Sequence, residues 1–474
     1  MAFDCDVVVL GMGTCGEDAA LRLAAAGLDV IGIEANLIGG ECPFWACLPT
    51  KSLVRSSNMV KEARRADGLV GSVAVETDWA VVAARIRAEI TGGWDDSGGV
   101  KRFEARGGRF VRGTGTLVGP HRVAVGDDEL SARIGVLVAT GSTPLIPPID
   151  GLAATPFWTH REAVASESLP ESLAIIGGGP VGCELAQVLS RFGVKVTIIE
   201  GSARLLAHGE PEASALIMDA FVDEGIDVRT GVHVASVSGD DEEVRLHLDD
   251  GSVLTAARLL LAVGRRGTAD RLGLENAGAN VSGGFVKVDE WMRAVAGLWA
   301  IGDITGPPLL TQVAVYQGRI AVEDILGASP RPADYSAMPA VTFTDPEVGS
   351  VGLTEDQARR EGRDVSVELK RLEATFRGWL HRTGNTGLIK MVAGVDEKRL
   401  VGATVVGPNA GEILGFLHLA VARQIPLENL VDLIYPFPTM YGGIGEALGA
   451  YGRGIVRVLD PGTAPMFDDP SFAS

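Results

Sequence analysis

The sequence has no long hydrophobic run. No stretch of 18 or more apolar residues occurs in its 474 residues, so it predicts no membrane-spanning helix. The N-terminus has no basic segment before the first strand-like run, Val7–Leu10, which argues against a secretory signal and leaves the cytoplasm as the expected location. No cluster of Lys and Arg offsets the formal net charge of -19, so neither nucleic acid nor an anionic membrane is expected as a partner.

Cysteine is scarce as well, with five residues in the chain. A disulfide framework is not expected in a large cytosolic chain. A zinc site needs four ligands at short spacings, and no second Cys or His pair of that kind follows Cys42 and Cys47, so no metal site is predicted. Cys5, Cys15 and Cys183 are interpreted as small buried packing residues.

What the chain does contain is a long internal repeat, within a length that predicts two to four domains. An apolar strand, a G-x-G-x-x-G turn, a helix and a strand ending in Glu occur twice. Each landmark recurs 166 positions later, from Gly11 to Gly177 and from Glu34 to Glu200. A lone glycine motif is weak evidence, but this context completes the fingerprint of a dinucleotide site in both copies. The alternative is a pair of ordinary glycine-rich turns.

The spacing of the glycines has a physical reason. The first Gly permits a tight turn, the second lets the backbone approach a pyrophosphate, and the third lets helix and strand pack closely. The helix N-terminus offers N–H groups to the phosphates, while Glu34 and Glu200 can each accept hydrogen bonds from a ribose. We therefore predict one bound flavin and one exchanging nicotinamide nucleotide. The glycines are Gly11, Gly13 and Gly16 in the first copy and Gly177, Gly179 and Gly182 in the second.

The rest of the chain separates into segments of different character. Apolar runs that end in turns at 136–144, 259–266 and 298–303 predict further buried strands. Beyond about residue 335, strand segments at 389–392 and 401–406 and an apolar helix from Ala410 to Gln424 predict an α+β domain. We expect an FAD-binding domain at 1–150 and 265–334, an NAD(P)-binding domain at 151–264, an interface domain at 335–455 and a flexible tail at 456–474.

Cys42 and Cys47 are five positions apart, within the segment 39–51 that follows the first repeat unit. Two thiols at this spacing can close a small, strained ring beside a helix start. A strained disulfide is easily reduced, which suits electron relay, and a helix N-terminus lowers the pKa of a thiol. The alternative is a pair of buried structural cysteines.

From about residue 4 to residue 450 the chain resembles the pyridine nucleotide–disulfide oxidoreductases, which include dihydrolipoamide dehydrogenase, glutathione reductase and mercuric reductase. Residues 39–51 are similar to the G-G-x-C-x4-C-x-P-[ST]-K segment of that family. Residues 139–144, 262–266 and 300–303 are similar to its nucleotide-contacting signatures, and residues 343–349 to the opening of its dimerisation domain. The resemblance implies an α/β fold with two Rossmann-like dinucleotide-binding domains, a C-terminal α+β dimerisation domain, and a homodimer with the active site across the interface.

The resemblance also implies residue roles. Cys42 would be the interchange thiol that meets the acceptor, Cys47 would present a thiolate to the flavin, and Lys51 would lie near the flavin, paired with Glu184. Without the resemblance, Lys51 and Glu184 could be ordinary surface charges. The residues expected to bind FAD are Gly11, Gly13, Gly16, Glu34, Gly40, Lys51, Gly115, Thr140, Gly141, Asp303 and Ala314, and those expected to bind NAD(P) are Gly177, Gly179, Gly182, Glu200, Gly264 and Arg265.

Two observations bear on the nucleotide. Glu200 favours NADH, because a carboxylate accepts bonds from a ribose 2′-OH but repels a 2′-phosphate. By the pattern of the family that the chain resembles, Ala186 leans weakly towards NADPH, and Arg204 could tolerate a 2′-phosphate.

The sequence departs from the family pattern in its last domain. The family carries His-Pro-Thr-x-x-Glu there, and Phe437 and Gly442 stand where the His and the Glu should be. A general acid–base contributes about 10²–10⁴-fold, so ordinary disulfides are disfavoured as substrates. Mercuric reductases use a cysteine pair near the C-terminus instead, and no Cys follows Cys183. The expected substrate pocket, with a polar hairpin edge as its alternative reading, comprises Arg377, Trp379, His381, Phe437 and Tyr441.

The sequence therefore favours an FAD-dependent NAD(P)H oxidoreductase that relays electrons through Cys42 and Cys47 to a small-molecule acceptor of a non-standard kind. A quinone, a metal ion and a reactive sulfur or oxidant species are the candidates. Three alternatives stay open: a quinone reductase that acts directly from the flavin, a dihydrolipoamide dehydrogenase-like disulfide reductase, and a non-catalytic redox-sensing flavoprotein.

Overall fold

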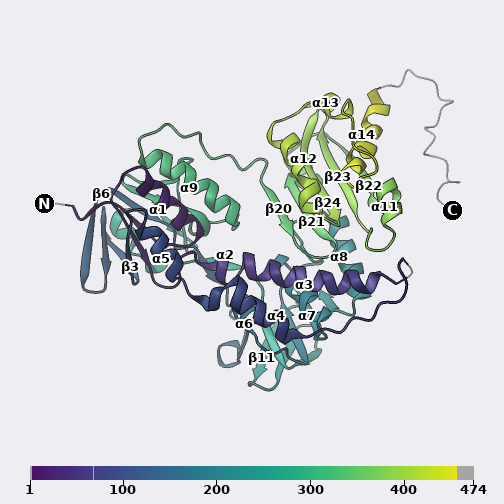
Figure 1. Cartoon of the computed structure of the whole chain (residues 1–474), viewed down its shortest axis with the longest axis horizontal. Coiled ribbons are helices and arrows are strands. Elements are labelled where there is room, and N and C mark those ends of the chain that lie inside the picture. Colours follow the sequence, from purple (N-terminus) through teal and green to yellow (C-terminus); the bar gives the residue numbers. More distant parts are fainter. Residues whose placement is uncertain (1–2, 68, 456–474) are drawn as a thin grey trace. The chain divides into compact units, whose positions relative to one another are not determined.

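The computed structural model describes residues 3–67 and 69–455, and the tail predicted at 456–474 lies outside the described residues (Figure 1). The chain divides into two compact units. The first comprises Met1–Ala207 and Met218–Asp334, and the second comprises His208–Ile217 and Tyr335–Ser474. A mainly parallel sheet and a fully parallel sheet lie in the first unit, and an antiparallel sheet lies in the second. This confirms the predicted fold class.

The first repeat unit forms β1 (Cys5–Leu10), α1 (Thr14–Ala25) and β2 (Val30–Glu34). These belong to a sheet with the order β18-β19-β6-β1-β2-β3, in which β1 runs parallel to both of its neighbours. The chain leads from β1 through α1 to β2 on one side, while β6 lies on the other side of β1. Open sheets of this kind bind ligands outside the carboxyl ends of their strands, at the point where the strand order reverses. The other strands of this path are β3 (Arg109–Arg112), β6 (Asp128–Val138), β18 (Arg293–Val295) and β19 (Leu298–Ala300).

Both faces of β1 are buried, as expected of a parallel strand. Val7 and Val9 pack on one side with residues of α1 and of α9 (Thr311–Ile325). Val8 and Leu10 pack on the other side with residues of β4 (Gly115–Gly119) and β5 (Arg122–Val125). Figure 1 shows α1 and α9 side by side. The core thus fixes the strand whose end carries the first glycine loop.

The second repeat unit forms β8 (Ser172–Ile176), α7 (Pro180–Arg191) and β9 (Lys195–Glu200) in a second parallel sheet. Its register repeats that of the first, since Leu10 pairs with Ile33 and Ile176 pairs with Ile199. The predicted strand, turn and helix therefore occur in both copies. The sheet has the order β10-β9-β8-β14, with β10 at Asp227–Thr230 and β14 at Arg258–Leu261.

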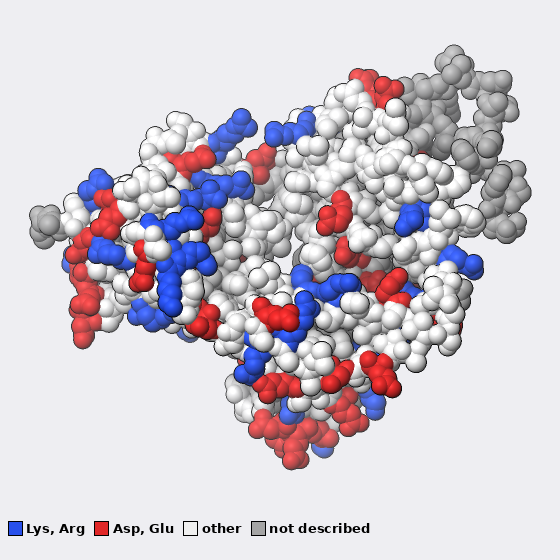
Figure 2. Space-filling model, in the orientation of Figure 1, with Lys and Arg blue, Asp and Glu red and all other residues white. Residues whose placement is uncertain are grey.

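Shorter elements complete the first unit. A three-stranded antiparallel sheet holds β11 (Val234–Gly239), β12 (Val244–Leu248) and β13 (Val253–Ala256). Figure 2 shows basic and acidic side chains interspersed on one face, with acidic ones gathered around β11.

The elements of the first unit that carry the residues of the site are α2 (Glu41–Phe44), α3 (Cys47–Arg65), η2 (Gly92–Trp94), β7 (Ser142–Pro144), α6 (His160–Ala165), β15 (Arg265–Gly267) and η6 (Gly302–Thr305). Further helices of this unit are α4 (Trp79–Arg85), η1 (Ile86–Ile90), α5 (Ser97–Glu104), η3 (Leu152–Ala154), η4 (Ala269–Arg271) and η5 (Leu274–Ala277).

The second unit is built on an antiparallel sheet with the order β20-β21-β24-β23-β22. The predicted strands at 389–392 and 401–406 are present and longer, and the helix predicted from Ala410 to Gln424 ends at Ala422. Its elements are β20 (Pro339–Thr342), β21 (Glu347–Gly352), α10 (Glu355–Arg360), β22 (Val365–Arg371), α11 (Phe376–His381), β23 (Leu388–Gly394), β24 (Arg399–Gly407), α12 (Ala410–Ala422), α13 (Leu427–Val431) and α14 (Gly442–Ile455).

One segment differs from the expected domain boundaries. Residues His208–Ile217, which include the first part of α8 (Pro211–Asp223), were expected in the NAD(P)-binding domain but group with the second unit. The reason is a buried charge cluster. Lys390 in β23 is 2% exposed, and its ammonium lies 2.9 Å from Glu210, 2.8 Å from Glu212 and 3.0 Å from Glu355. These contacts hold the segment on the C-terminal sheet.

Removing the cation of this cluster is expected to be strongly destabilising. Lys390→Met leaves the Glu210 carboxylate, which is 2% exposed, without its cation, and breaking a buried pair in this way costs about 3–5 kcal/mol. Lys370→Met is the matched control, because Lys370 and Glu446 are both about 30% exposed and such a pair contributes at most ~1 kcal/mol. Thermal unfolding followed by circular dichroism measures both. Equal midpoints for the two variants would contradict the expectation.

Candidate active site

The first glycine loop has the shape that a dinucleotide requires. Gly11 has φ +93°, and a Cβ on it would lie 2.6 Å from the Ala139 carbonyl oxygen. A Cβ on Gly16 would lie 2.0 Å from the Gly11 carbonyl oxygen, so the third glycine is required for the helix to meet the loop. Around Gly13 a Cβ would meet nothing within 4 Å, which leaves open space at the position where a pyrophosphate approaches.

The second glycine loop repeats this geometry. Gly177 has φ +110°, and its Cβ would lie 2.4 Å from the Ala262 carbonyl oxygen. A Cβ on Gly182 would lie 2.0 Å from the Gly177 carbonyl oxygen, and around Gly179 a Cβ would again meet nothing within 4 Å. Both helices that follow, α1 and α7, begin without a side-chain cap. Their N-terminal N–H groups are therefore available to phosphates.

The two acidic residues of the fingerprint occupy equivalent positions. Glu34 accepts hydrogen bonds from the N–H of Met12 at 2.8 Å and of Asn36 at 2.7 Å. Glu200 accepts bonds from Gly178 at 2.6 Å and Ser202 at 2.6 Å. Each carboxylate is thus held beside its glycine loop with lone pairs left for a ribose. The residues present fit two dinucleotides, and the assignment of FAD to the first loop stays a prediction.

The cysteine segment starts directly on the first glycine loop. The N–H of Gly39 donates to the Met12 carbonyl oxygen at 2.7 Å, and the Thr14 hydroxyl donates to the Gly39 carbonyl oxygen at 3.0 Å. A Cβ on Gly40, which has φ +69°, would lie 2.8 Å from the Gly13 Cα. The chain after Gly40 forms α2, which carries Cys42, and then α3, which begins at Cys47.

The two cysteines are free, half-buried thiols with different environments. A hydrogen bond from Cys42 lowers the pKa of Cys47 to about 6 against the effect of burial, and the Thr311 hydroxyl, 3.3 Å away, and the charge of Lys51 add to this. The same hydrogen bond, together with burial, raises the pKa of Cys42. The pair is therefore arranged as a thiolate at Cys47 and a thiol at Cys42.

Lys51 and Glu184 lie together in the structure. Lys51 is one helical turn after Cys47 on α3, and its Nζ is 2.7 Å from Glu184 Oε2 on α7. The Glu184 side chain is 7% exposed and that of Lys51 is 38% exposed. The ion pair therefore links the helix of the thiolate to the helix of the second glycine loop. Their role towards a flavin stays a prediction.

Several other expected cofactor residues lie on, or just after, strands of the sheet that contains β1. Thr140 and Gly141 follow β6, Asp303 lies in η6 after β19, and Gly115 begins β4. A Cβ on Gly115 would lie 2.5 Å from a side-chain carbon of Leu10. The N–H of Ala314 donates to the Leu310 carbonyl oxygen at 3.0 Å within α9, so the expected backbone contact there stays a prediction.

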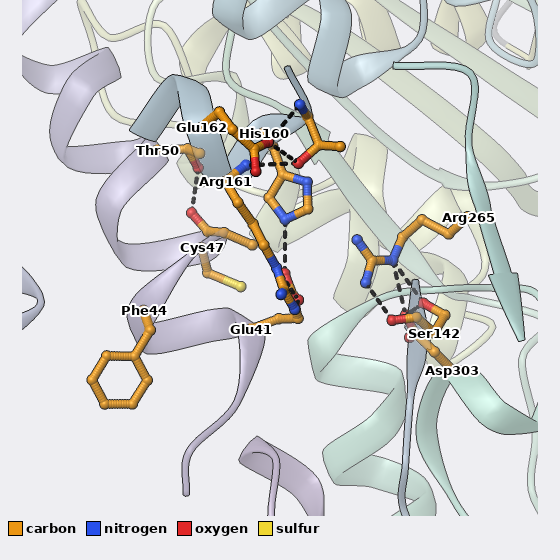
Figure 3. Close-up of polar contacts among 12 residues, drawn as sticks. Glu41, Phe44, Cys47, Thr50, Ser142, His160, Arg161, Glu162, Arg265 and Asp303 are labelled. Carbon is orange, nitrogen blue, oxygen red and sulfur yellow. Dashed lines mark hydrogen bonds and ion pairs between the residues drawn. The ribbon is translucent and has the colours of Figure 1, made fainter. Parts of the chain in front are cut away.

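Arg265, which was expected to bind NAD(P), contacts Ser142 and Asp303, and Asp303 was itself expected to bind FAD. Its Nε donates to the Ser142 hydroxyl at 2.6 Å and lies 3.6 Å from Asp303, and Ser142 donates to Asp303 at 2.6 Å (Figure 3). The antiparallel pairing of β15 with β7 brings these residues together. Gly264, at the turn before β15, has φ +114°.

The expected substrate pocket belongs to the second unit. Phe437 is 71% exposed, and its ring contacts Phe376 edge to face at 5.1 Å. Trp379 is 60% exposed on α11, the helix that also carries Arg377 and His381. The Tyr441 ring packs against Phe416 at 5.2 Å. Where the family has a histidine, this unit therefore presents an aromatic surface.

Sequence reasoning missed one group of residues beside the cysteines. Glu41 contacts His160 and Arg161, and the Trp45 ring, within the cysteine segment, stacks on Trp94. Glu41 and Trp45 lie on either side of Cys42 in the sequence, and this proximity is a local signal for a role near the dithiol. Their partners are far away in sequence and carry no local signal.

The chain combines two dinucleotide-type glycine loops with a dithiol segment, and this combination defines a class of two-nucleotide oxidoreductase. Residues 5–318 match the family model "Pyridine nucleotide-disulphide oxidoreductase", and residues 338–448 match the dimerisation domain of the same family. The chain belongs to the pyridine nucleotide–disulfide oxidoreductase family, whose FAD-dependent members use NAD(P)H. The dimerisation domain supports a homodimer. In the described part of the chain, no helix is long and apolar enough to span a bilayer.

Relatives of different activity are similar to this chain. Dihydrolipoyl dehydrogenase of Thermus scotoductus is 34% identical over 96% of this chain and 99% of the relative, and mercuric reductase of Acidithiobacillus ferrooxidans is 33% identical over 95% and 83%. Among solved structures, the HOCl-induced flavoprotein disulfide reductase RclA from Escherichia coli has a TM-score of 0.83 at 26% identity, covering 94% of this chain and 99% of RclA. LpdA from Mycobacterium tuberculosis has a TM-score of 0.84 at 26% identity, with the same coverage.

The repeat allows the two nucleotide sites to be tested separately. Gly16→Ala and Gly182→Ala introduce the same 2.0 Å clash in the two loops. We expect Gly16→Ala to lose FAD on gel filtration, and Gly182→Ala to retain FAD while its KM for NAD(P)H rises at least about tenfold, a transition-state loss of roughly 1.4 kcal/mol. Gly98→Ala, where a Cβ meets nothing within 4 Å, is the control. Loss of FAD from Gly182→Ala but not from Gly16→Ala would reverse the assignment.

Proposed function

We propose that this chain is an NAD(P)H oxidoreductase that passes electrons through FAD and the Cys42–Cys47 pair to an acceptor other than an ordinary disulfide. The observation that supports the relay most directly is the pair itself, a thiol beside a thiolate at the start of α3, on a segment that rests on the first glycine loop.

The relay balances as a two-electron exchange. FAD, when bound, takes hydride from NAD(P)H and supplies two electrons to the Cys42–Cys47 disulfide. With one proton, the disulfide becomes a thiol at Cys42 and a thiolate at Cys47. Lys51 stabilises the thiolate, and Glu184 holds Lys51 in place. Two electrons then pass from the pair to the acceptor, either one quinone or two Cu(II) ions, and the pair returns to the disulfide and releases one proton.

The acceptor must be one that needs no protein acid. Phe437 and Gly442 stand at the family's acid–base positions, and Phe437 is an exposed aromatic residue in an aromatic surface. A disulfide acceptor has to leave as a thiol, whereas a quinone, a metal ion or a reactive oxidant does not require a positioned proton donor. RclA, a similar structure, is known as a complex with Cu(II). We propose that the site lies across the dimer interface, which would bring Phe437 of one subunit near Cys42 of the other.

NADH is the proposed donor. Both oxygens of Glu200 are fixed by backbone N–H groups at 2.6 Å, so the carboxylate stays where the ribose would bind. A fixed negative charge there disfavours a 2′-phosphate.

An acceptor screen with purified holoprotein tests the proposal. NADH oxidation is measured with a quinone, Cu(II), oxidised lipoamide and glutathione disulfide, each repeated with NADPH. We expect turnover with the first two to exceed that with the disulfides by about 10² or more, the range that a missing acid–base accounts for. Cys42→Ser should abolish this turnover. If Cys42→Ser retains it, the protein reduces its acceptor directly from the flavin, and negligible turnover with every acceptor would favour a redox sensor.

Restoring the family residues tests the missing acid–base. Phe437→His is expected to raise disulfide reduction by supplying the missing acid–base. Because Phe437 is 71% exposed, its replacement gives up the edge-to-face contact with Phe376 but leaves no buried cavity. Adding Gly442→Glu should help less than the family pattern suggests, since a Cβ there would lie 2.9 Å from the Pro436 carbonyl oxygen. Single and double variants are compared with lipoamide at several pH values. Wild-type lipoamide turnover equal to that of dihydrolipoyl dehydrogenases would show that Phe437 removes nothing essential.

A further inference from the structure

A charged contact holds the turn that carries Cys42. Glu41 is the first residue of α2 and directly precedes Cys42. Its carboxylate lies 2.7 Å from His160 Nε2 and accepts a bond from Arg161 Nε at 2.9 Å, with a further contact from Arg161 Nη2. Although burial opposes it, these bonds lower the pKa of Glu41 to about 2, so the group is ionised. Figure 3 shows His160 and Arg161 both pointing at Glu41, with Cys47 beside them. We call these three residues the Glu41 clamp.

The clamp is anchored on the second parallel sheet. His160 and Arg161 are the first residues of α6, whose N-terminus is fixed by a capping box between Thr159 and Glu162. Trp158, which directly precedes Thr159, is hydrogen-bonded to β14: its N–H donates to the Leu259 carbonyl oxygen at 2.7 Å, and its carbonyl oxygen accepts from the Leu261 N–H at 2.8 Å. His160 is only 7% exposed. The backbone that carries both partners of Glu41 is therefore fixed, and the His160 side chain is buried.

The same turn is also held after Cys42. The Arg161 guanidinium lies over the Trp45 ring at 5.6 Å, and the Trp45 ring stacks on Trp94 at 5.3 Å. Trp94 Nε1 donates to the Phe44 carbonyl oxygen at 3.2 Å. A helix of four residues has no stability of its own. The position of the Cys42 backbone therefore depends on contacts on either side of it.

We propose that Glu41, His160 and Arg161 are positioning residues that hold the Cys42 sulfur against Cys47. The inference uses the proposed function only in taking Cys42 and Cys47 as the redox pair. It assigns a role to His160 and Arg161 of α6. These residues lie outside the dithiol segment, 119 and 120 positions after Glu41.

The charges around Cys47 show why the effect is positional. The groups that face the Cys47 sulfur are the Cys42 thiol from α2, the Thr311 hydroxyl from α9 and the Lys51 ammonium from its own helix, which Glu184 of α7 holds in place. Glu41 is not among these groups, and its charge is paired with Arg161. The Glu41 clamp therefore acts on Cys47 indirectly, by fixing the position of Cys42.

Thiol alkylation measures this without any electron acceptor. The holoprotein is reduced chemically, treated with iodoacetamide over a range of pH, and the modified residues are identified by mass spectrometry. The three other cysteines are buried, and burial raises the pKa of both Cys5 and Cys15 to about 12, so they provide an internal background. In the wild type, Cys47 should react with an apparent pKa of about 6.

Glu41→Gln and Arg161→Met should each raise the apparent pKa of Cys47 by about one unit, a tenfold lower thiolate fraction at pH values below it. Combined, they should shift it no further than the larger single effect, because both break one contact. Arg161→Lys, which keeps the charge but not the planar fork, should give an intermediate shift. Glu167→Gln is the matched control: it removes the partner of Arg87 in an exposed pair and should leave the profile unchanged.

An unchanged Cys47 profile in both single variants, or additive shifts in the double variant, would overturn the proposal. If Glu41→Gln fails to fold, His160→Gln tests the same contact from the other side. If the variants raise the pKa of Cys47 but NAD(P)H does not reduce the Cys42–Cys47 disulfide of the wild type, the proposed function is refuted and this inference stands. If NAD(P)H reduces the disulfide but both single variants leave the Cys47 profile unchanged, the inference is refuted and the proposed function stands.

Discussion

The close packing of residues 39 and 40 on the first glycine loop is the contact on which the geometry of the site depends. Gly40 approaches so near to Gly13 that a Cβ would lie 2.8 Å from its Cα, and Gly39 donates its N–H to the carbonyl of Met12. Because β1 is buried on both faces, this loop cannot shift without disturbing the core. The nucleotide loop and the dithiol are thus parts of one rigid structure, and the start of α3 has little freedom in where it begins.

The two thiols, which their mutual hydrogen bond already makes unequal, also differ in the helices that carry them. Cys42 is in a helix of four residues, whereas Cys47 is the first residue of a helix of 19 residues. A long helix places a partial positive charge at its N-terminus, and Lys51 adds a full charge one turn later. The thiolate therefore forms where the backbone and a nearby cation both favour it. The paired Glu184 keeps that cation in place at a half-buried position.

Sequence reasoning could predict the features that are encoded locally. The glycines, the two strands and the acidic residue of each repeat unit lie within one short stretch, and their spacing specifies the turn, so both copies were predicted closely. The ion pair of Lys51 with Glu184 could be expected only from the resemblance to a family. Three features had no local signal: the contacts of His160 and Arg161 with Glu41, the placement of Arg265 beside Asp303, and the grouping of residues 208–217 with the C-terminal sheet. Each of them joins segments far apart in the chain, where only tertiary packing decides the outcome.

The charge cluster around Lys390 has a consequence for how this protein can be divided. Glu210 and Glu212 lie in the segment 208–217, which belongs to the C-terminal unit and contacts its sheet. After residue 217 the chain leaves this unit and returns to it only at residue 335. A fragment that begins at residue 335 would therefore contain the buried lysine without two of its three carboxylates. Closing so long a loop has an entropic cost that must be met before the cluster can form. The C-terminal unit is thus compact in space but discontinuous in sequence. During synthesis, residues 208–217 leave the ribosome first, and the cluster cannot be completed until the sheet that carries Lys390 has followed them.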